Sequence, residues 1–359
     1  MTLNSVYTKI RTPSSMSNLK KSFEELQNRL GRAPLLLDFT RFDLVDPNVI
    51  ATKQKNYWKF LNKIGATDSI AEEHEDSILT MLSEELLNGK RPHEMLLLKE
   101  LLSNYGVLPI GSFLDLLAQN NLTADPATLN SVIAVLSLEF FTEPETKKYG
   151  AEPIVTFADD IYSLNKKFLT AFTADLIFNS HVRDVLETGL YLARNRNNWR
   201  SDLQVGERYS RKDVCRLLNW QSNQASTIYG YKVDSFSNSC PIFVTYHKST
   251  TVSESTKYPD EFLNPSTLKW FTRSNRTLQT SEVKTIVENQ IPLYVFAKKD
   301  DAEGTDFYYL GKAISKDASQ TTMAGKGESK LNVVTMTLQL ATPIETSLYE
   351  YFEAQTVGN

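Results

Sequence analysis

Residue types that form disulfides, metal centres and membrane spans are scarce in this sequence. Only two of its 359 residues are cysteines, Cys215 and Cys240, and only four are histidines. Two cysteines support neither a disulfide framework nor a cysteine-rich zinc site. No apolar run approaches the roughly 18 residues that indicate a membrane span, and the first residues, MTLNSVYTKIR, lack the apolar core of a signal peptide. We therefore expect a cytoplasmic protein without a metal or another cofactor.

Several catalytic signatures are also missing. The sequence contains no G-x-x-x-x-G-K-[ST] loop, so ATP hydrolysis has no phosphate-binding loop. No histidine is followed by one spacer residue and a lysine, the order that phospholipase-D-type nucleases require. Lys248 follows His247 directly, which on a strand places the two side chains on opposite faces. The H-x-E and P-C-x-x-C pair of zinc deaminases is absent as well. We expect a chain without catalytic residues.

The composition changes near Arg200. With 41% apolar residues, the chain is long enough for two domains that each have a core. After Arg200 the basic and acidic residues are about equal in number, so the net charge of −4 arises mainly before it. A protein that binds nucleic acid indiscriminately usually carries a basic excess. We predict two domains, residues 1–200 and 201–359, and expect any nucleic-acid contact to come from a local basic cluster.

The first domain is predicted to be all-α. Asp46 and Asp125 each precede a proline, as an N-cap carboxylate precedes the first helical turn. Amphipathic runs are followed by glycines that can end a helix in the αL conformation: Gly31, Gly65, Gly89 and Gly106. Residues 69–87 predict one helix with an apolar face formed by Ile70, Ile78, Leu79, Leu82, Leu86 and Leu87. Its opposite face carries acidic residues around His74, which we interpret as solvated rather than as a metal site: Glu72, Glu73, Glu75, Asp76, Glu84 and Glu85.

The second domain is predicted to be a small mixed β-barrel with peripheral helices, which makes the fold class α+β. Four runs rich in β-branched and aromatic residues predict strands at residues 240–247, 291–298, 306–315 and 332–340. In the last run Val334, Met336, Leu338 and Leu340 alternate onto one side. Helices are predicted at residues 210–218 and 281–289. Residues 315–330 lack apolar periodicity and predict a mobile loop, either one whose lysines touch phosphates or a plain solvated hairpin loop.

Residues 207–310 resemble a known family. The segments GERYSRKDVCRLLNW, GYKVDSFSNSCPIFVTYHK, LKWFTRSNRTLQTSEV and IPLYVFAKKDDAEGTDFYYLG are similar to the C-terminal module of bacterial proteins that fuse a phospholipase-D-type nuclease and a superfamily-2 helicase to a DNA-reading domain. LGRAPLLLDFTRFD and NYWKFLNKIG resemble the helices that precede this module. Such proteins resemble type IV, modification-dependent restriction enzymes, and the module resembles SRA and PUA/ASCH-type barrels.

This resemblance implies a target-recognition module. It would bind double-stranded DNA that carries 5-methylcytosine or a related modified cytosine, and would read that base by flipping it out of the duplex. Its partners would be helicase and nuclease domains of the same or another chain. The first domain would couple recognition to those partners.

A flipped base needs aromatic surfaces on its faces and a polar group at its Watson–Crick edge. A carboxylate suits cytosine because its N4 amino group is a donor. We expect Trp270 above all in the pocket, because its sequence context, NPSTLKWFTRSNRT, is rich in turn residues. In a small barrel, however, most aromatic residues belong to the core. The candidates for the pocket are Tyr229, Tyr231, Tyr246, Trp270, Phe271 and Tyr308, with Asn275 or Asp306 at the base edge.

Basic residues in three segments are candidates for phosphate contacts. Arg208, Arg211, Lys212 and Arg216 share a face at helical spacing, beside a buried stripe of Val214, Leu217 and Leu218. Arg273 and Arg276 follow Trp270, and Lys316, Lys326 and Lys330 lie in the predicted loop. Two alternatives remain open. The basic helix could dock on the acidic first domain, and the whole chain could be a non-catalytic adaptor that contacts a helicase or nuclease without binding a modified base.

Overall fold

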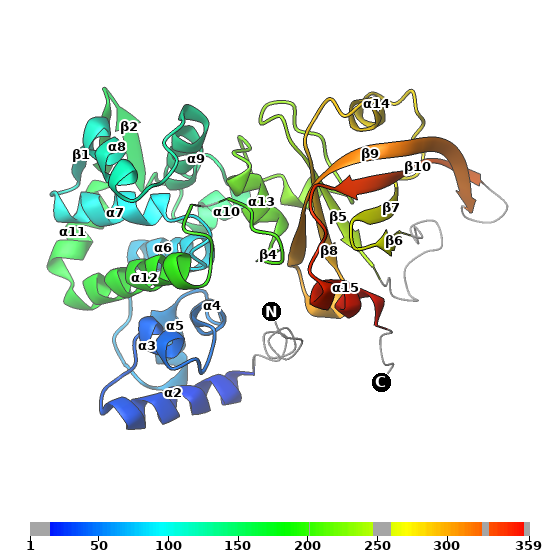
Figure 1. Ribbon diagram of the computed structural model, residues 1–359. Helices are drawn as coiled ribbons and strands as arrows, with labels where there is room; N and C mark the ends of the chain where they lie inside the picture. Colours follow the sequence, from blue (N-terminus) through cyan, green and yellow to red (C-terminus); the bar gives the residue numbers. More distant parts are fainter. Residues whose placement is uncertain (1–14, 201, 247–259, 325–329, 355–359) are drawn as a thin grey trace. The chain divides into compact units, whose positions relative to one another are not determined.

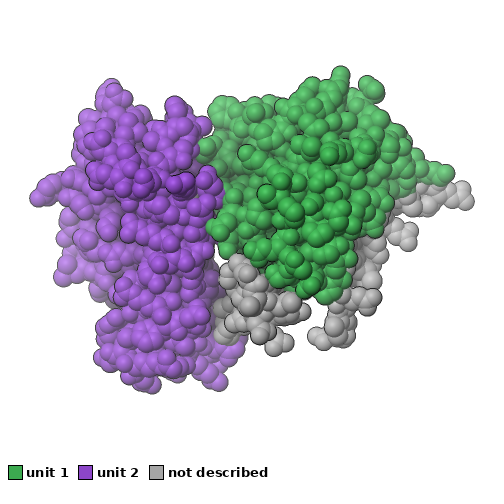
Figure 2. Space-filling view, in the orientation of Figure 1, with its two compact units in different colours: residues 1–10, 203–359 green, residues 11–202 purple. Residues whose placement is uncertain are grey.

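The computed structural model describes residues 15–200, 202–246, 260–324 and 330–354. The chain divides into two compact units, residues 11–202 and residues 203–359 together with 1–10 (Figure 2). We call the first the helical unit and the second the sheet unit, and describe each by itself. Among the described residues, no helix is both long and apolar enough to cross a membrane.

The helical unit is built mainly from short amphipathic helices (Figure 1). They are α2 (Met16–Leu30), α3 (Leu36–Arg41), α4 (Pro47–Thr52), α5 (Tyr57–Ile64), α6 (Glu73–Met81), the π-helical turn η1 (Leu82–Leu86), α7 (His93–Ser103), α8 (Ile110–Gln119), α9 (Pro126–Leu136), α10 (Glu143–Lys148), α11 (Lys166–Ala174) and α12 (Leu176–Asn195). Three short strands pair in the antiparallel order β1-β3-β2: β1 (Val107–Pro109), β2 (Val155–Ala158) and β3 (Ile161–Leu164). The sequence predicted helices only, because strands of three or four residues show no clear periodicity.

The predicted helix ends are confirmed where their caps are formed. The Asp46 carboxylate accepts a hydrogen bond from the backbone N–H of Asn48, and Asp125 caps α9 in the same way. Gly31 and Gly65 end α2 and α5 in the αL conformation. These residues satisfy backbone groups that a helix end leaves unpaired.

The predicted helix over residues 69–87 needs two corrections. It begins only at Glu73, and Ile70, expected on the apolar face, is 83% exposed. The acidic face is not uniformly solvated, because Glu75 and Glu85 are buried. Glu75 accepts a hydrogen bond from the backbone N–H of Glu72, and Glu85 accepts one from the Tyr149 hydroxyl. Both carboxylates hold the fold of the helical unit together rather than facing water.

In its described residues, the sheet unit contains one strongly curved mixed sheet and three short helices, so the predicted α+β class is confirmed (Figure 1). Its main strand order is β5-β8-β9-β10-β7-β6, with β4 paired to β9, and only β5 and β8 run parallel. The strands are β4 (Arg208–Tyr209), β5 (Cys240–Thr245), β6 (Glu261–Asn264), β7 (Thr267–Phe271), β8 (Leu293–Lys298), β9 (Phe307–Ala324) and β10 (Lys330–Leu340). The helices are α13 (Arg211–Leu217), α14 (Ser281–Val287) and α15 (Thr346–Glu353), with 3-10 turns η2 (Ala225–Thr227) and η4 (Asp301–Glu303).

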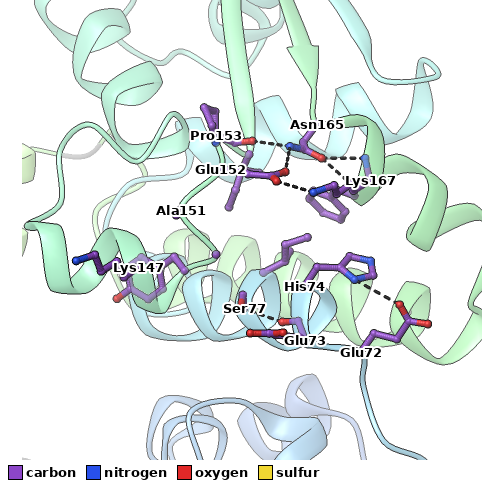
Figure 3. Close-up of a pocket in the computed structure, with 15 residues that line it drawn as sticks. Glu72, Glu73, His74, Ser77, Lys147, Ala151, Glu152, Pro153, Asn165 and Lys167 are labelled. Carbon is purple, nitrogen blue, oxygen red and sulfur yellow. Dashed lines mark hydrogen bonds and ion pairs between the residues drawn. The ribbon is translucent and has the colours of Figure 1, made fainter.

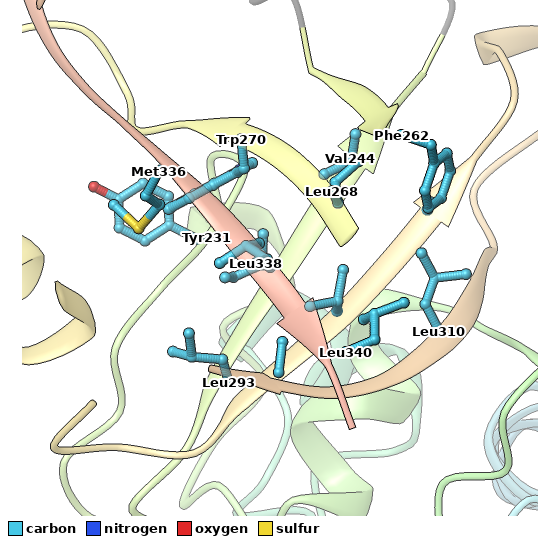
Figure 4. Close-up of a cluster of buried hydrophobic side chains, with 14 of the residues drawn as sticks. Tyr231, Val244, Phe262, Leu268, Trp270, Leu293, Leu310, Met336, Leu338 and Leu340 are labelled. Carbon is cyan, nitrogen blue, oxygen red and sulfur yellow. The ribbon is translucent and has the colours of Figure 1, made fainter. Parts of the chain in front are cut away.

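The concave face of this sheet holds the apolar core (Figure 4). Val334, Met336, Leu338 and Leu340 are buried there, as their alternation predicted. Among the described residues, the edge strands β5 and β6 do not pair with each other, so the sheet is an incompletely closed barrel. The two edges nevertheless come close, because the Phe262 N–H donates to the Tyr246 hydroxyl at 3.4 Å.

The predicted mobile loop at residues 315–330 is wrong. β9 continues to Ala324 and β10 begins at Lys330, and the two strands form a long antiparallel hairpin. Its outer part extends beyond the core. Backbone pairing there requires no apolar side chains, which explains why the sequence shows no apolar periodicity.

Candidate nucleic-acid interface

Several of the predicted DNA-contacting residues converge on one carboxylate, Glu282, in the first turn of α14. Arg273 donates from Nη2 to both Glu282 oxygens at 2.8 Å, and Arg276 donates from Nε at 2.5 Å. The Tyr231 hydroxyl donates to the same carboxylate at 3.0 Å. The Arg273 guanidinium also lies over the Tyr231 ring, 4.6 Å from its centroid. We call Tyr231, Arg273, Arg276 and Glu282 the Glu282 cluster.

The cluster is electrostatically self-consistent and carries a surplus of one positive charge. Burial disfavours the Glu282 carboxylate, but hydrogen bonds from Arg276 and Arg273 outweigh burial and lower its pKa. Burial likewise opposes the charge on Arg273, yet the Glu282 hydrogen bond raises its pKa. Burial and the nearby carboxylate raise the pKa of Tyr231. The Arg273 guanidinium and the Glu282 carboxylate therefore stay charged together.

The segment that carries Arg273 and Arg276 is fixed to the β9–β10 hairpin. The Arg276 N–H donates to the Asn332 carbonyl at 3.2 Å, and the Gln320 side chain accepts from the Leu278 N–H at 3.1 Å. The Gln320 amide also donates to the Arg276 carbonyl at 3.4 Å. Because these contacts come from two strands, both arginines project from a defined backbone.

Trp270 is not where the sequence predicted it. It lies in β7 opposite Met336 of β10, is 2% exposed, and packs edge-on against Tyr231 with ring centroids 5.1 Å apart (Figure 4). The turn-forming residues before it belong to the tight β6–β7 connection, not to an open loop. The expectation that Trp270 stands outside the core is wrong, and its ring presents no free face to a base.

The other base-pocket candidates divide into buried and accessible residues. Tyr231, Tyr308 and Phe271 are buried, and Tyr246 packs against the core. Asp306 is half-buried, and its carboxylate accepts from the Thr305 hydroxyl at 3.3 Å. The accessible candidates are Tyr229, which is 68% exposed, and Asn275, which is exposed with a φ of 60°.

The basic patch predicted around α13 does not form. Arg208 lies on β4, before the helix, and donates to the carbonyls of Glu303 and Asp306. Arg216 is only 3% exposed and pairs with Asp213 at 3.2 Å. The buried side chains of α13 are Val214, Cys215 and Arg216, whereas Leu217 and Leu218 are half-buried. Lys212 and Arg211 are half-buried as well.

The lysines of the hairpin do not form one surface either. Lys316 pairs with Thr337 of β10. Because Met336 points into the core, its neighbour Thr337 points outward, and Lys316 opposite it lies on the outer face as well. Lys330 shares the inner side with Val334 but is exposed beyond the core. Lys326 lies outside the described residues.

Sequence reasoning did not identify Glu282 or Gln320. Glu282 looked like an ordinary acidic residue in the first turn of a helix, where the helix dipole stabilises negative charge. Gln320 fell in the segment that predicted a loop. A useful signal would have been the spacing of Arg273, Arg276 and Glu282, which lie within ten residues with opposite charges across a turn.

A separate cavity of about 520 Å³ lies in the helical unit. Its lining combines the apolar residues Ile78, Ile154 and Phe168 with charged residues of both signs. The Lys167 ammonium pairs with Glu152 at 2.5 Å, and His74 lies 3.5 Å from Glu72 (Figure 3). Among the described residues, no three His, Cys, Asp or Glu side chains are grouped to hold a metal ion.

A family model described as a domain of unknown function, DUF8090, matches residues 19–198, which is just over half of the chain. The chain belongs to the DUF8090 family. A second model, also described as a domain of unknown function, DUF3427, matches residues 203–352 of this DUF8090 protein. No curated protein matches it.

Solved structures show distant similarity. The DUF8090 protein is 15% identical to a chain titled "crystal structure of KRYPTONITE in complex with mCHH DNA, H3(1-15) peptide and SAH", with a TM-score of 0.28 over 40% of this chain and 34% of that chain. The match thus spans about a third of the KRYPTONITE chain. "Sulfur binding domain and SRA domain of ScoMcrA complexed with phosphorothioated DNA" matches at 11% identity and a TM-score of 0.26, over 60% of this chain and 67% of that chain.

A third structure, "Structure of the Type IV phosphorothioation-dependent restriction endonuclease ScoMcrA", matches at 11% identity and a TM-score of 0.25, over 95% of this chain and 71% of that chain. At these identities and TM-scores, the likeness by itself assigns no ligand to the DUF8090 protein.

Proposed function

We propose that the sheet unit binds duplex DNA and recognises a modified cytosine, as the non-catalytic target-recognition part of a modification-dependent restriction system. The observation that supports this most is the Glu282 cluster, which presents two oriented arginines on a rigid segment. Arginine forks suit phosphate and base-edge contacts because several N–H donors point in fixed directions. The sequence resemblance to SRA-like modules supplies the class of ligand.

Base recognition in this proposal depends on Tyr229 and Asn275 rather than on Trp270. An extruded base must stack on an accessible aromatic face and meet a polar group at its edge. Of the predicted pocket residues, Tyr229 has the accessible ring and Asn275 has the accessible amide. We propose that these two side chains contact the flipped base.

An electrophoretic shift series with the full chain tests the proposal. Plain, 5-methylcytosine, 5-hydroxymethylcytosine and phosphorothioate duplexes of one sequence would be compared at the same salt concentration, since affinity depends strongly on salt. We expect one modified duplex to bind more tightly than the plain one. Equal binding of all four would refute modified-base recognition, and no binding even at low salt would refute DNA binding altogether.

A second candidate function is an adaptor role for the helical unit. The cavity in this unit favours it, because a lining that combines apolar residues with charged residues of both signs suits an amphipathic protein segment. In that case a bulky substitution in the cavity lining, Ala151→Trp, should weaken co-purification with a helicase or nuclease domain. The same substitution should leave duplex binding unchanged.

A further inference from the structure

Arg211 is held in an unusual environment on the convex side of the sheet unit. Its guanidinium carbon lies 5.4 Å from the centroid of the Phe243 ring and 5.1 Å from that of Phe307. The two rings pack edge-to-face with centroids 5.1 Å apart. Arg211 Nε is buried and has no hydrogen-bond partner among the described residues. The aromatic rings therefore fix the orientation of a guanidinium whose Nε–H donor is not satisfied there.

The neighbouring charges do not neutralise Arg211. Asp301 is close enough to raise its pKa, although burial lowers that pKa more strongly. The Asp301 carboxylate, however, already pairs with Lys298 at 2.9 Å, and Lys298 also donates to the Gly304 carbonyl. Arg208, the nearest arginine in sequence, has carbonyl acceptors of its own. Within this group, Arg211 is the arginine that has no acceptor among the described residues.

Keeping an oriented, half-buried guanidinium without an acceptor costs free energy in the free protein. Binding of an anion with several oxygens would supply the missing acceptors. Phosphate fits this requirement, because its oxygens can accept two parallel hydrogen bonds from one guanidinium. Aromatic rings on the guanidinium face leave its edge for such a ligand.

We propose that Arg211 is a phosphate-binding residue, separate from the Glu282 cluster. In its specific form this inference rests on the proposed function, since the phosphate would belong to the backbone of a DNA duplex. The same chemistry would bind free phosphate, and the two sources can be distinguished by experiment.

The test compares the full chain with Arg211→Gln and with Lys312→Gln as a matched control. Lys312 is exposed, and its ammonium group also lies over an aromatic ring, 5.3 Å from the Tyr294 centroid. Its substitution therefore also removes a cation that contacts an aromatic ring. For plain duplex, we expect Arg211→Gln to reduce the slope of log affinity against log salt by about one, the change for one lost phosphate contact. Lys312→Gln should leave the slope unchanged.

A second measurement uses inorganic phosphate alone. At equal ionic strength, phosphate should raise the melting temperature of the wild-type chain above its value in chloride, and Arg211→Gln should lose this difference. If the wild-type chain binds no duplex but this response is present and depends on Arg211, the proposed function fails and the Arg211 site stands as a site for free phosphate. An unchanged salt slope together with an unchanged phosphate response would overturn the inference and make Arg211 a structural cation.

Arg211→Lys covers the case in which Arg211→Gln fails to fold. Lysine keeps the charge and the apolar stem but loses the planar fork, so the salt slope should persist while duplex affinity falls by about fivefold, the equivalent of about one hydrogen bond. If Arg211→Lys matches the wild-type chain in affinity, a bidentate phosphate contact is refuted.

Discussion

Replacing Glu282 by glutamine should separate the structural role of the Glu282 cluster from its proposed role in DNA binding. Glu282 accepts hydrogen bonds from Arg273, Arg276 and Tyr231, and its side chain is 24% exposed. Glutamine keeps one acceptor oxygen but turns an amide donor toward the guanidinium groups. Hydrogen bonds to charged groups contribute about 1.5–3 kcal/mol each, and part of this is retained by the remaining oxygen and by water.

We expect Glu282→Gln to lower the free energy of unfolding by about 2 kcal/mol. For a unit of this size, the melting temperature would fall by about 4–8 °C. Glu288→Gln is the matched control: it makes the same chemical change at the end of α14, where Glu288 has an exposed ion pair with Lys284 at 3.8 Å and accepts an exposed hydrogen bond from the Gln290 amide at 2.6 Å. Exposed pairs of this kind contribute little, so Glu288→Gln should leave the melting temperature nearly unchanged.

The same variant should bind plain duplex DNA more tightly. Without the Glu282 charge, the cluster has one more uncompensated positive charge to neutralise a phosphate, and the salt slope should steepen by about one. A variant that is destabilised but binds DNA with unchanged affinity and salt slope would show that the arginines do not face the duplex. A variant as stable as the wild-type chain would refute the structural role that the hydrogen bonds assign to Glu282.

Three further predictions follow from burial. Trp270→Ala should lower the free energy of unfolding by about 3–5 kcal/mol, because a large core side chain is lost; a stable variant in thermal melting would contradict its core position. Tyr229→Ala should leave the melting temperature unchanged but abolish discrimination between modified and plain duplexes, and preserved discrimination would remove Tyr229 from the proposed pocket. In α12, burial lowers the pKa of His181 to about 4 and raises that of Asp184 to about 6. Because the folded protein favours neutral His181, the contribution of His181 to the free energy of unfolding falls as the pH falls from 6.5 towards 4. Because the folded protein favours protonated Asp184, the contribution of Asp184 falls as the pH rises from 3.8 through 6. These two contributions oppose each other between about pH 4 and 6. His181→Phe removes the first contribution and keeps an aromatic ring beside Trp58. In this variant, the free energy of unfolding should therefore fall with rising pH by about 1.4 kcal/mol per pH unit relative to the wild-type chain. Parallel pH profiles of the two proteins in denaturant titrations would refute this.

Local signals in the sequence predicted much of the fold. The alternation of Val334, Met336, Leu338 and Leu340 reflects a strand with one buried face, and capping by Asp46 and Asp125 depends only on neighbouring backbone groups. Such features are visible without knowing the tertiary structure.

The errors arise where a distant segment decides the outcome. Trp270 is buried because β10 places Met336 opposite it, although its own neighbours are turn formers. Helical spacing predicts the pairing of Arg216 with Asp213, three residues before it, but does not predict the burial of Arg216. The Glu282 cluster draws on Tyr231, about fifty residues away in sequence, and no local pattern predicts that contact.

Under the proposed function, a sheet unit without a basic excess would read DNA, and the internal pairing of its arginines bears on how it would do so. Indiscriminate binding grows with each phosphate that a free cation neutralises. Here Arg208 and Arg216 are bonded within the chain, and Glu282 compensates one of the two charges of Arg273 and Arg276, which limits the number of cations available to any duplex. Affinity for unmodified DNA should therefore be low, and a larger share of the binding free energy would come from contacts that only a modified base provides. On this reasoning, the near balance of basic and acidic residues favours selectivity and does not argue against DNA recognition.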